Sequence, residues 1–97
     1  MMRRLYFVTY DICDPKRLRR VYKTMKGFGA HLQFSVFQCE LPDMDLIKMK
    51  VALVEVINHQ EDHVLIVDLG PTEGRPIKSI ESLGKGFTQV ERRAQVV

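Results

Sequence analysis

The sequence predicts an α+β fold in a single domain of residues 1–97. An apolar strand pattern is followed by an amphipathic helix, and a second helix separates the later strand patterns. The length of 97 residues is usual for one compact domain. Two helices can cover one face of a small sheet, which leaves the other face bare. The expected architecture is therefore a sheet with a single layer of helices.

The first strand is predicted over residues 4–10, where both alternating faces are largely apolar, as in a central strand. Asp14 is a good N-cap and Pro15 suits the first helical position, so a helix begins there. It runs to about Lys26 and stops at Gly27. The i, i+3, i+4, i+7 spacing gives its buried stripe: Leu18, Val21, Tyr22 and Met25.

The middle of the chain contains a strand, a helix and a second central strand. Residues 32–41 are interpreted as one strand, and residues 63–69 form a nearly continuous apolar run. Between them a helix begins at Pro42–Asp43 and extends to about Ile57. The predicted apolar face of this helix is Leu46, Met49, Leu53, Val54 and Ile57.

Two weaker strands are predicted near the end of the chain, over residues 77–83 and 87–93. With residues 32–41 as one strand, the order departs from the ferredoxin-like βαββαβ plan. Either the order is a variant, or residues 30–41 contain a hairpin. A bare apolar sheet face favours a subunit interface, and the strand that begins at Phe87 suits pairing with a second chain.

Charge is unevenly distributed along the chain, although the formal net charge is only +3. Residues 1–39 carry eight Lys or Arg against two acids, a net +6. Residues 40–68 carry a net −5 and residues 69–97 a net +2. A basic first third beside an acidic middle indicates that one surface meets a polyanion.

A family resemblance rests on four segments: Tyr10-Asp11-Ile12, Lys16-Arg17-Leu18-Arg19-Arg20-Val21, Gln33-Phe34-Ser35-Val36-Phe37 and Phe87-Thr88-Gln89-Val90-Glu91. In this order they resemble the second core CRISPR-associated family, the small subunit of the complex that inserts new spacers. The resemblance implies a homodimeric ferredoxin-like fold in which residues 87–97 form an extra strand that joins the partner's sheet. It also implies CRISPR adaptation, with metal-dependent endonuclease activity in some members. A DNA-bridging role beside an integrase subunit is the alternative that it implies.

Asp11 is the principal candidate site residue, because it follows a rigid strand and precedes a basic helix. One interpretation is a turn carboxylate that accepts backbone hydrogen bonds. The other is a catalytic ligand for Mg²⁺ or another divalent metal, since Mg²⁺ uses one or two carboxylates together with water and substrate phosphate. A two-fold axis nearby would add the second chain's carboxylate. Arg17 is the candidate catalytic clamp for the transition state.

The first helix is also a candidate nucleic-acid interface. Six of the eleven residues from 16 to 26 are basic, and no acid relieves them within the helix. A solvated helix face is the simpler interpretation, whereas a bound phosphate backbone would relieve the repulsion. The predicted contacts to nucleic acid are Lys16, Arg17, Arg19, Arg20, Lys23 and Lys26.

Several nearby residues have simpler expected roles. Asp14 is expected to cap the helix, and Cys13 to be a free thiol, since no histidine close in sequence would activate it. Ser35 and Phe37 are expected on one strand face, with Phe37 in the core or a subunit interface. The two cysteines lack metal spacing and no apolar run is long enough for a bilayer, which favours a cytoplasmic protein without a membrane anchor.

Three functions remain open from the sequence. The first is a metal-dependent endonuclease that hydrolyses phosphodiester bonds of RNA or DNA at Asp11. The second is a non-catalytic DNA-binding scaffold between integrase subunits. The third, weaker one is a stand-alone toxin-like ribonuclease of similar fold.

Overall fold

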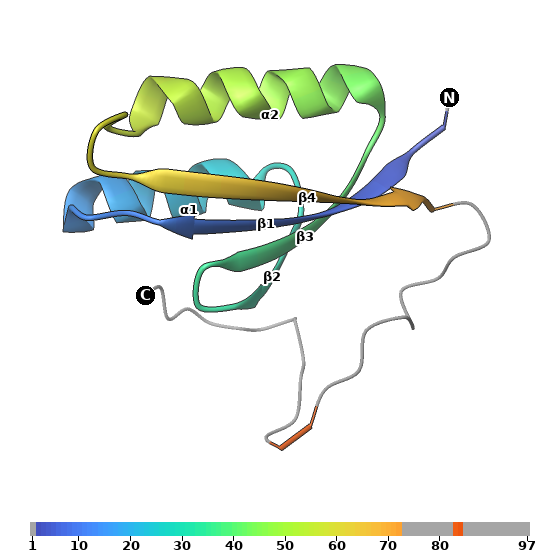
Figure 1. The fold of residues 1–97 in the computed structure, drawn as a ribbon, viewed down its shortest axis with the longest axis horizontal. Helices are drawn as coiled ribbons and strands as arrows, with labels where there is room; N and C mark the ends of the chain where they lie inside the picture. Colours follow the sequence, from blue (N-terminus) through green and yellow to red (C-terminus); the bar gives the residue numbers. More distant parts are fainter. Residues whose placement is uncertain (1, 73–82, 85–97) are drawn as a thin grey trace.

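The computed structural model describes residues 2–72 and 83–84 and contains one antiparallel sheet with two helices on one face (Figure 1). The elements follow in the ferredoxin-like order βαββαβ, which confirms the predicted fold class. The strands lie in the order β2-β3-β1-β4. The element bounds are β1 Arg4–Asp11, α1 Pro15–Lys26, β2 Ala30–Gln33, β3 Val36–Leu41, α2 Asp43–Val56 and β4 His63–Pro71.

The single strand predicted over residues 32–41 is wrong, and the alternative of a hairpin within residues 30–41 is correct. The chain turns at Phe34 and Ser35, and β2 pairs antiparallel with β3. The sequence concealed this turn because it contains neither the Gly nor the Asn that tight hairpins favour. The hairpin supplies the strand that the ferredoxin-like order had lacked.

The last described strand is also placed differently from the prediction. Residues 63–69 are a strand as predicted, but within the described part of the chain β4 pairs with β1 alone, at the edge of the sheet. The strands expected over residues 77–83 and 87–93 lie outside the described residues, apart from Leu83.

Helix α1 begins and ends where the sequence predicted. Asp14 caps it, accepting hydrogen bonds from the backbone N–H groups of Lys16 and Arg17 at 2.9 and 3.0 Å. Gly27 ends the helix with a φ of −79°, so this glycine is not needed for a left-handed backbone. A local cap and a complete apolar stripe are sufficient to specify this helix.

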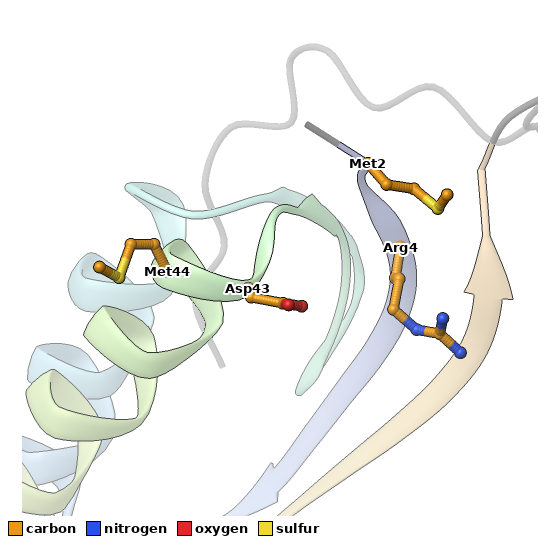
Figure 2. Close-up of a pocket in the computed structure, with 4 residues that line it drawn as sticks. All are labelled: Met2, Arg4, Asp43 and Met44. Atoms are coloured by element: carbon orange, nitrogen blue, oxygen red, sulfur yellow. The ribbon is translucent and has the colours of Figure 1, made fainter.

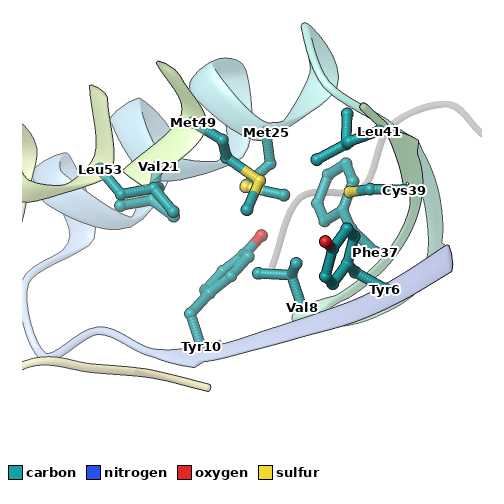
Figure 3. Close-up of a cluster of buried hydrophobic side chains, with 10 residues drawn as sticks. All are labelled: Tyr6, Val8, Tyr10, Val21, Met25, Phe37, Cys39, Leu41, Met49 and Leu53. Carbon is teal, nitrogen blue, oxygen red and sulfur yellow. The ribbon is translucent and has the colours of Figure 1, made fainter. Parts of the chain in front are cut away.

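The core lies between the two helices and the face of the sheet that they cover (Figure 3). Alternate residues of β1 and β3 meet the stripes of both helices there, as side chains two apart on a strand share one face. Phe37 is fully buried, as expected for a core residue. The core cluster contains Tyr6, Val8, Tyr10, Val21, Met25, Phe37, Cys39, Leu41, Met49 and Leu53.

Helix α2 is apolar on both sides, which makes its core face hard to predict. Met49 and Leu53 are buried as predicted, but Val54 is 51% exposed, so its predicted place on the core face is wrong. Its neighbours on the outer side, Ile47 and Val51, are similarly exposed. No helix among the described residues is long and apolar enough to cross a membrane.

The sheet face turned away from the helices carries apolar side chains in solvent, as the sequence predicted. Leu65, Val67 and Leu69 of β4 are 50%, 44% and 39% exposed in the described chain. On β1, Phe7 lies opposite Val67 and Thr9 opposite Leu65. We call this surface, formed by Phe7, Thr9, Leu65, Val67 and Leu69, the open sheet face.

We predict that Gly29→Ala destabilises the fold by about 1–3 kcal/mol, the usual cost of overpacking. A Cβ at Gly29 would lie 2.4 Å from the carbonyl oxygen of Gln38 and 2.5 Å from Sγ of Cys39. The backbone oxygen cannot move without disturbing β3. The free energy of unfolding in urea measures the effect.

Gly27→Ala is the matched control, because its added Cβ meets only the Thr24 carbonyl oxygen at 3.4 Å and its φ suits alanine. We expect this variant to be as stable as the parent or slightly more stable. Equal losses of stability in both variants would contradict the packing explanation.

Candidate active site at the end of the first strand

Asp11 is the last residue of β1, and its side chain is exposed. In the strand register it lies opposite His63, the first residue of β4. Directly paired residues of antiparallel strands project from the same face. Because Asp11 continues the alternation of Phe7 and Thr9, it stands at the rim of the open sheet face.

Tyr10, the residue before Asp11, belongs to the core rather than to the site. Its ring centroid lies 6.2 Å from that of Phe37, and burial raises the pKa of Tyr10 to about 12. Tyr10 therefore keeps its proton at neutral pH and is unsuited to act as a base. Its role is to anchor the end of β1.

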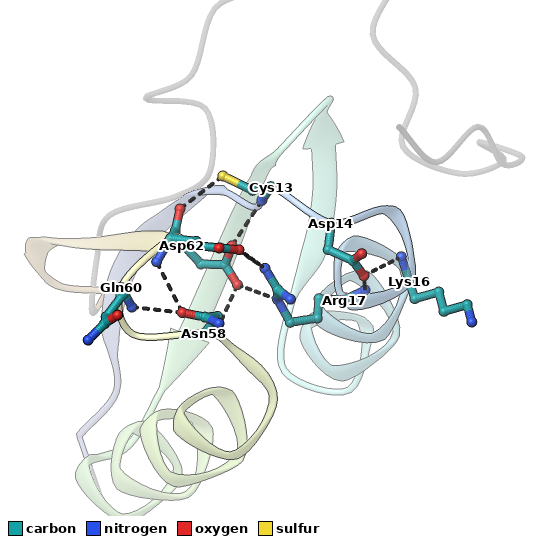
Figure 4. A network of polar contacts seen from close by, with 8 residues as sticks. Cys13, Asp14, Lys16, Arg17, Asn58, Gln60 and Asp62 are labelled. Carbon is teal, nitrogen blue, oxygen red and sulfur yellow. Dashed lines mark hydrogen bonds and ion pairs between the residues drawn. The ribbon is translucent and has the colours of Figure 1, made fainter.

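A network of polar contacts follows directly after Asp11 and joins the β1–α1 loop to the α2–β4 loop (Figure 4). At its centre the side chain of Asp62 is fully buried. Its carboxylate accepts hydrogen bonds from the backbone N–H groups of Cys13 at 2.9 Å and Asn58 at 2.8 Å. These bonds fix the position of a loop residue only two places beyond Asp11.

Arg17 completes the network from the first turn of α1. Its Nε donates to Asp62 at 2.7 Å, and its Nη2 donates to Asp62 and to Glu61, each at 3.1 Å. Hydrogen bonding to Arg17 is the main reason that the pKa of Asp62 lies well below its usual range. The same contact raises the pKa of Arg17. The paired groups therefore remain charged throughout the neutral range.

Cys13 is exposed and forms no disulfide with the other described cysteine, Cys39. Its Sγ donates to the backbone carbonyl of Glu61 at 3.0 Å, which adds a further contact between the two loops. Cys13 therefore links the two loops twice, through its backbone N–H and through its thiol.

The remaining basic residues of α1 form an exposed surface, which we call the basic face: Lys16, Arg19, Arg20, Lys23 and Lys26. Arg17 is the exception among the six predicted nucleic-acid contacts, because 21% of its side chain is exposed and it faces carboxylates. The structure therefore separates one basic residue that joins two loops from five that face solvent.

Ser35 lies in the β2–β3 turn, so the expectation that it shares a strand face with Phe37 is wrong. Its backbone carbonyl accepts a hydrogen bond from the N–H of Tyr10 at 3.2 Å. This contact brings the turn to the end of the sheet that carries Asp11 (Figure 1).

A separate hollow of about 350 Å³ lies at the opposite end of β1, lined by Met2, Arg4, Asp43 and Met44 (Figure 2). Arg4 begins the strand that Asp11 ends, so this hollow is distant from the candidate site. Its lining contains one carboxylate and one guanidinium, and it brings in none of the predicted site residues.

A divalent metal fits the donor set of one chain only in part. Among the described residues, no three His, Cys, Asp or Glu side chains converge in a way that would hold a metal. Asp11 offers a metal ion one carboxylate, and this side chain is exposed to solvent. That is compatible with Mg²⁺, which typically keeps several waters and uses few protein ligands. A carboxylate from a second chain would give such an ion a second protein ligand.

The comparison with known proteins decides the family. The family model described as CRISPR associated protein Cas2 matches residues 2–75, which include every candidate site residue. The chain belongs to the Cas2 family. This confirms the resemblance inferred from the sequence.

Individual relatives agree with this assignment. The chain is 52% identical over 96 residues to a protein of Geobacter sulfurreducens named CRISPR-associated endoribonuclease Cas2, covering 99% of this chain and all of the relative. A protein of Rhodospirillum rubrum named CRISPR-associated endoribonuclease Cas2 1 is 50% identical over 92 residues, covering 95% of this chain and 89% of the relative. The crystal structure of Streptococcus pyogenes Cas2 superposes with a TM-score of 0.70 at 29% identity, covering 82% and 99%.

Sequence reasoning missed Asp62 and His63 as neighbours of the candidate site at Asp11. Asp62 is 45 residues from Arg17 in the chain. It lies after the second helix in residues 58–62, whose polar sequence is typical of an ordinary loop. Only the antiparallel pairing of β1 with β4 brings both residues beside Asp11. The acidic pair Glu61-Asp62, directly before a strand start, was the one available signal.

We predict that Asp62→Asn destabilises the fold at neutral pH and that this loss shrinks in acid. The amide removes the charge and places a donor against the donors Arg17 or Asn58. The folded pKa of Asp62 is lowered, so its contribution is present above the unfolded pKa of about 4 and is lost as pH falls towards the folded value. Urea midpoints at pH 7, 4, 3 and 2 measure the difference.

Glu61→Gln is the control for this experiment, since its side chain is 58% exposed although it contacts the same Arg17. Exposed ion pairs contribute little to stability, so we expect a small change at every pH. A stability gap between Asp62→Asn and the parent that stays constant from pH 7 to 2 would refute the assignment.

Proposed function

We propose that this chain is a metal-dependent endonuclease of CRISPR adaptation, which hydrolyses phosphodiester bonds in RNA at Asp11 of a homodimer. The observation that carries the proposal is the position of Asp11, exposed at the rim of the open sheet face and beside a basic helix. The names of the two relatives at 52% and 50% identity support RNA as the substrate.

The open sheet face supports the homodimer. A second copy that covers Leu65 and Val67 would bury apolar surface that is otherwise in water, at roughly 25 cal/mol per Å². In a two-fold interface each residue meets the same surface of its partner. Since Asp11 borders this surface, two copies packed here with their two-fold axis near Asp11 bring the two carboxylates towards each other.

The paired carboxylates are the proposed ligands for Mg²⁺. When bound, such an ion supplies electrostatic stabilisation of phosphoryl oxygens and a water of lowered pKa. The protein's own contribution is to hold Asp11 at the end of a rigid strand and to fix the following loop through Asp62. The carboxylate is thus placed before substrate arrives, which is the usual requirement for a precise site.

The basic face supports binding of the substrate backbone. Its five side chains are exposed, and three residues separate α1 from the strand that ends at Asp11. Lys and Arg side chains on one surface neutralise phosphates and release counterions. In this proposal, a strand bound along the start of α1 passes close to the carboxylate.

We predict that Asp11→Asn lowers metal-dependent cleavage of RNA by at least about a hundredfold while RNA affinity changes less than twofold. The substitution keeps the shape of the side chain and removes the charge needed for a hard cation. Cleavage of an end-labelled RNA with and without Mg²⁺ measures the first quantity, and fluorescence anisotropy in EDTA measures the second.

Asp43→Asn is the matched control, because it removes one exposed carboxylate at the far end of β1. We expect cleavage by this variant to equal that of the parent. Full activity of Asp11→Asn would remove the catalytic assignment.

We predict that the double variant Arg19→Gln with Arg20→Gln weakens nucleic-acid binding equally for unrelated sequences and flattens its salt dependence. Each lost phosphate contact reduces the slope of log K against log salt by about 0.7 for single strands, so two contacts give about 1.4. Anisotropy titrations between 50 and 300 mM salt (roughly the range over which such contacts are screened) measure the slope.

Lys48→Gln with Lys50→Gln removes the same charge from exposed positions on α2 and is the control. Its salt slope should equal that of the parent. Equal slopes for the two double variants would show that net charge, rather than the basic face, determines binding.

The scaffold remains the second candidate function, and the basic face is the observation that favours it. In that case the dimer bridges integrase subunits and holds duplex DNA, with Asp11 incidental. Spacer integration in cells separates the two. Integration that survives Asp11→Asn but fails with the Arg19 and Arg20 double variant supports the scaffold.

A further inference from the structure

Phe34 occupies an unusual place in the turn between β2 and β3. Its φ is +35°, a left-handed value that bulky side chains rarely adopt. Tight hairpin turns that need positive φ usually contain Gly, Asn or Asp there. Its side chain is also 70% exposed, so the ring gains little from burial. Neither turn preference nor core packing explains an aromatic residue at this position.

The turn is held in place from two sides. The backbone carbonyl of Phe34 lies 2.7 Å from Nε2 of His31, and the next carbonyl, of Ser35, accepts the N–H of Tyr10. The His31 ring packs in turn against Tyr22 of α1, with ring centroids 5.1 Å apart. The exposed ring is therefore displayed on a supported turn.

The position of this turn relates it to the candidate site. Thr9 pairs with Val36, and Tyr10 bonds to Ser35, so the turn stands at the end of the sheet where β1 delivers Asp11 (Figure 1). The contact between His31 and Tyr22 ties the same turn to α1, which carries the basic face. An exposed aromatic ring thus lies at the same end of the sheet as the Asp11 carboxylate, on a turn that contacts the helix of the basic face.

We propose that Phe34 is a stacking platform for an unpaired base of a single-stranded RNA, an inference that rests on the nuclease function proposed above. Every base has a flat face that an aromatic ring can stack on, without reading sequence. In a duplex those faces are occupied by neighbouring bases. The platform therefore gives the site a preference for single strands, whereas the basic face binds single and double strands alike.

Phe34→Gly tests this without a cost in folding, because glycine adopts a φ of +35° readily. We expect its stability to equal or exceed that of the parent. Its affinity for a fluorescein-labelled single-stranded RNA should fall by about tenfold, the usual scale for one stacked base. Its affinity for a duplex of the same length should change less than twofold. Anisotropy titrations in EDTA measure both, with no cleavage.

Phe34→Leu tests stacking without removing the side chain. Leucine keeps an apolar group but offers no aromatic face, so the same selective loss is expected. Unchanged single-strand affinity in both variants would overturn the proposal, as would an equal loss for duplex. So would a change in sedimentation coefficient in both variants, which would mean that the ring contacts another protein chain.

A spectroscopic test uses the absence of tryptophan from the sequence. Phe34→Trp introduces a single fluorophore, which we expect to be quenched on addition of single-stranded RNA as a base stacks on it. Met44→Trp, at a 57% exposed position on α2, is the control and should not be quenched. Equal fluorescence changes at both positions would refute stacking at residue 34.

These outcomes are independent of the catalytic assignment. If the parent fails to cleave RNA while the Phe34 variants lose single-strand affinity, the nuclease proposal fails and the stacking platform stands. If Asp11→Asn abolishes cleavage while Phe34→Gly binds RNA normally, only the stacking platform fails.

Discussion

The ion pair between Arg17 and Asp62 is the contact on which the candidate site depends. A fully buried carboxylate is costly unless its hydrogen-bonding capacity is satisfied, and Asp62 receives four donor contacts. Two of them come from Arg17, and the others come from the two loops that it joins. Cys13 lies two residues after Asp11, and His63 directly follows Asp62. The pair therefore fixes both flanks of the end of β1 at once.

The same pair divides the charge of α1 between two tasks. Arg17 is turned towards carboxylates, while the five residues of the basic face remain in solvent. A guanidinium is suited to the first task, since its planar fork holds a carboxylate with two parallel bonds. Its proposed contact with a transition state stays a prediction. The observed geometry favours a role through the loop, because two of its nitrogens already donate to Asp62 and Glu61.

What the sequence predicted well is local. The cap at Asp14 and the apolar spacing of α1 lie within about a dozen residues, so both can be recognised without knowing any tertiary contact. Asp11 was predicted as a strand-end carboxylate for the same reason. The hairpin was hidden because Phe34 replaces the expected turn residue, and Asp62 was missed because its partner is 45 residues away. Val54 was misplaced because α2 is apolar on two sides, so its periodicity cannot identify the core face.

Two exposed apolar surfaces are available to the second copy in the proposed homodimer, and the metal site proposed at Asp11 selects one of them. One is the open sheet face, and the other is the outer side of α2 with Ile47 and Val51. Contacts across a two-fold axis occur twice, so a single carboxylate becomes a pair only where it borders the interface. Asp11 borders the open sheet face, whereas α2 covers the opposite side of the sheet. A dimer formed through α2 would leave the two carboxylates on remote surfaces. Packing through the sheet, with the two-fold axis near Asp11, would bring them together, and their mutual repulsion would then favour a bound cation.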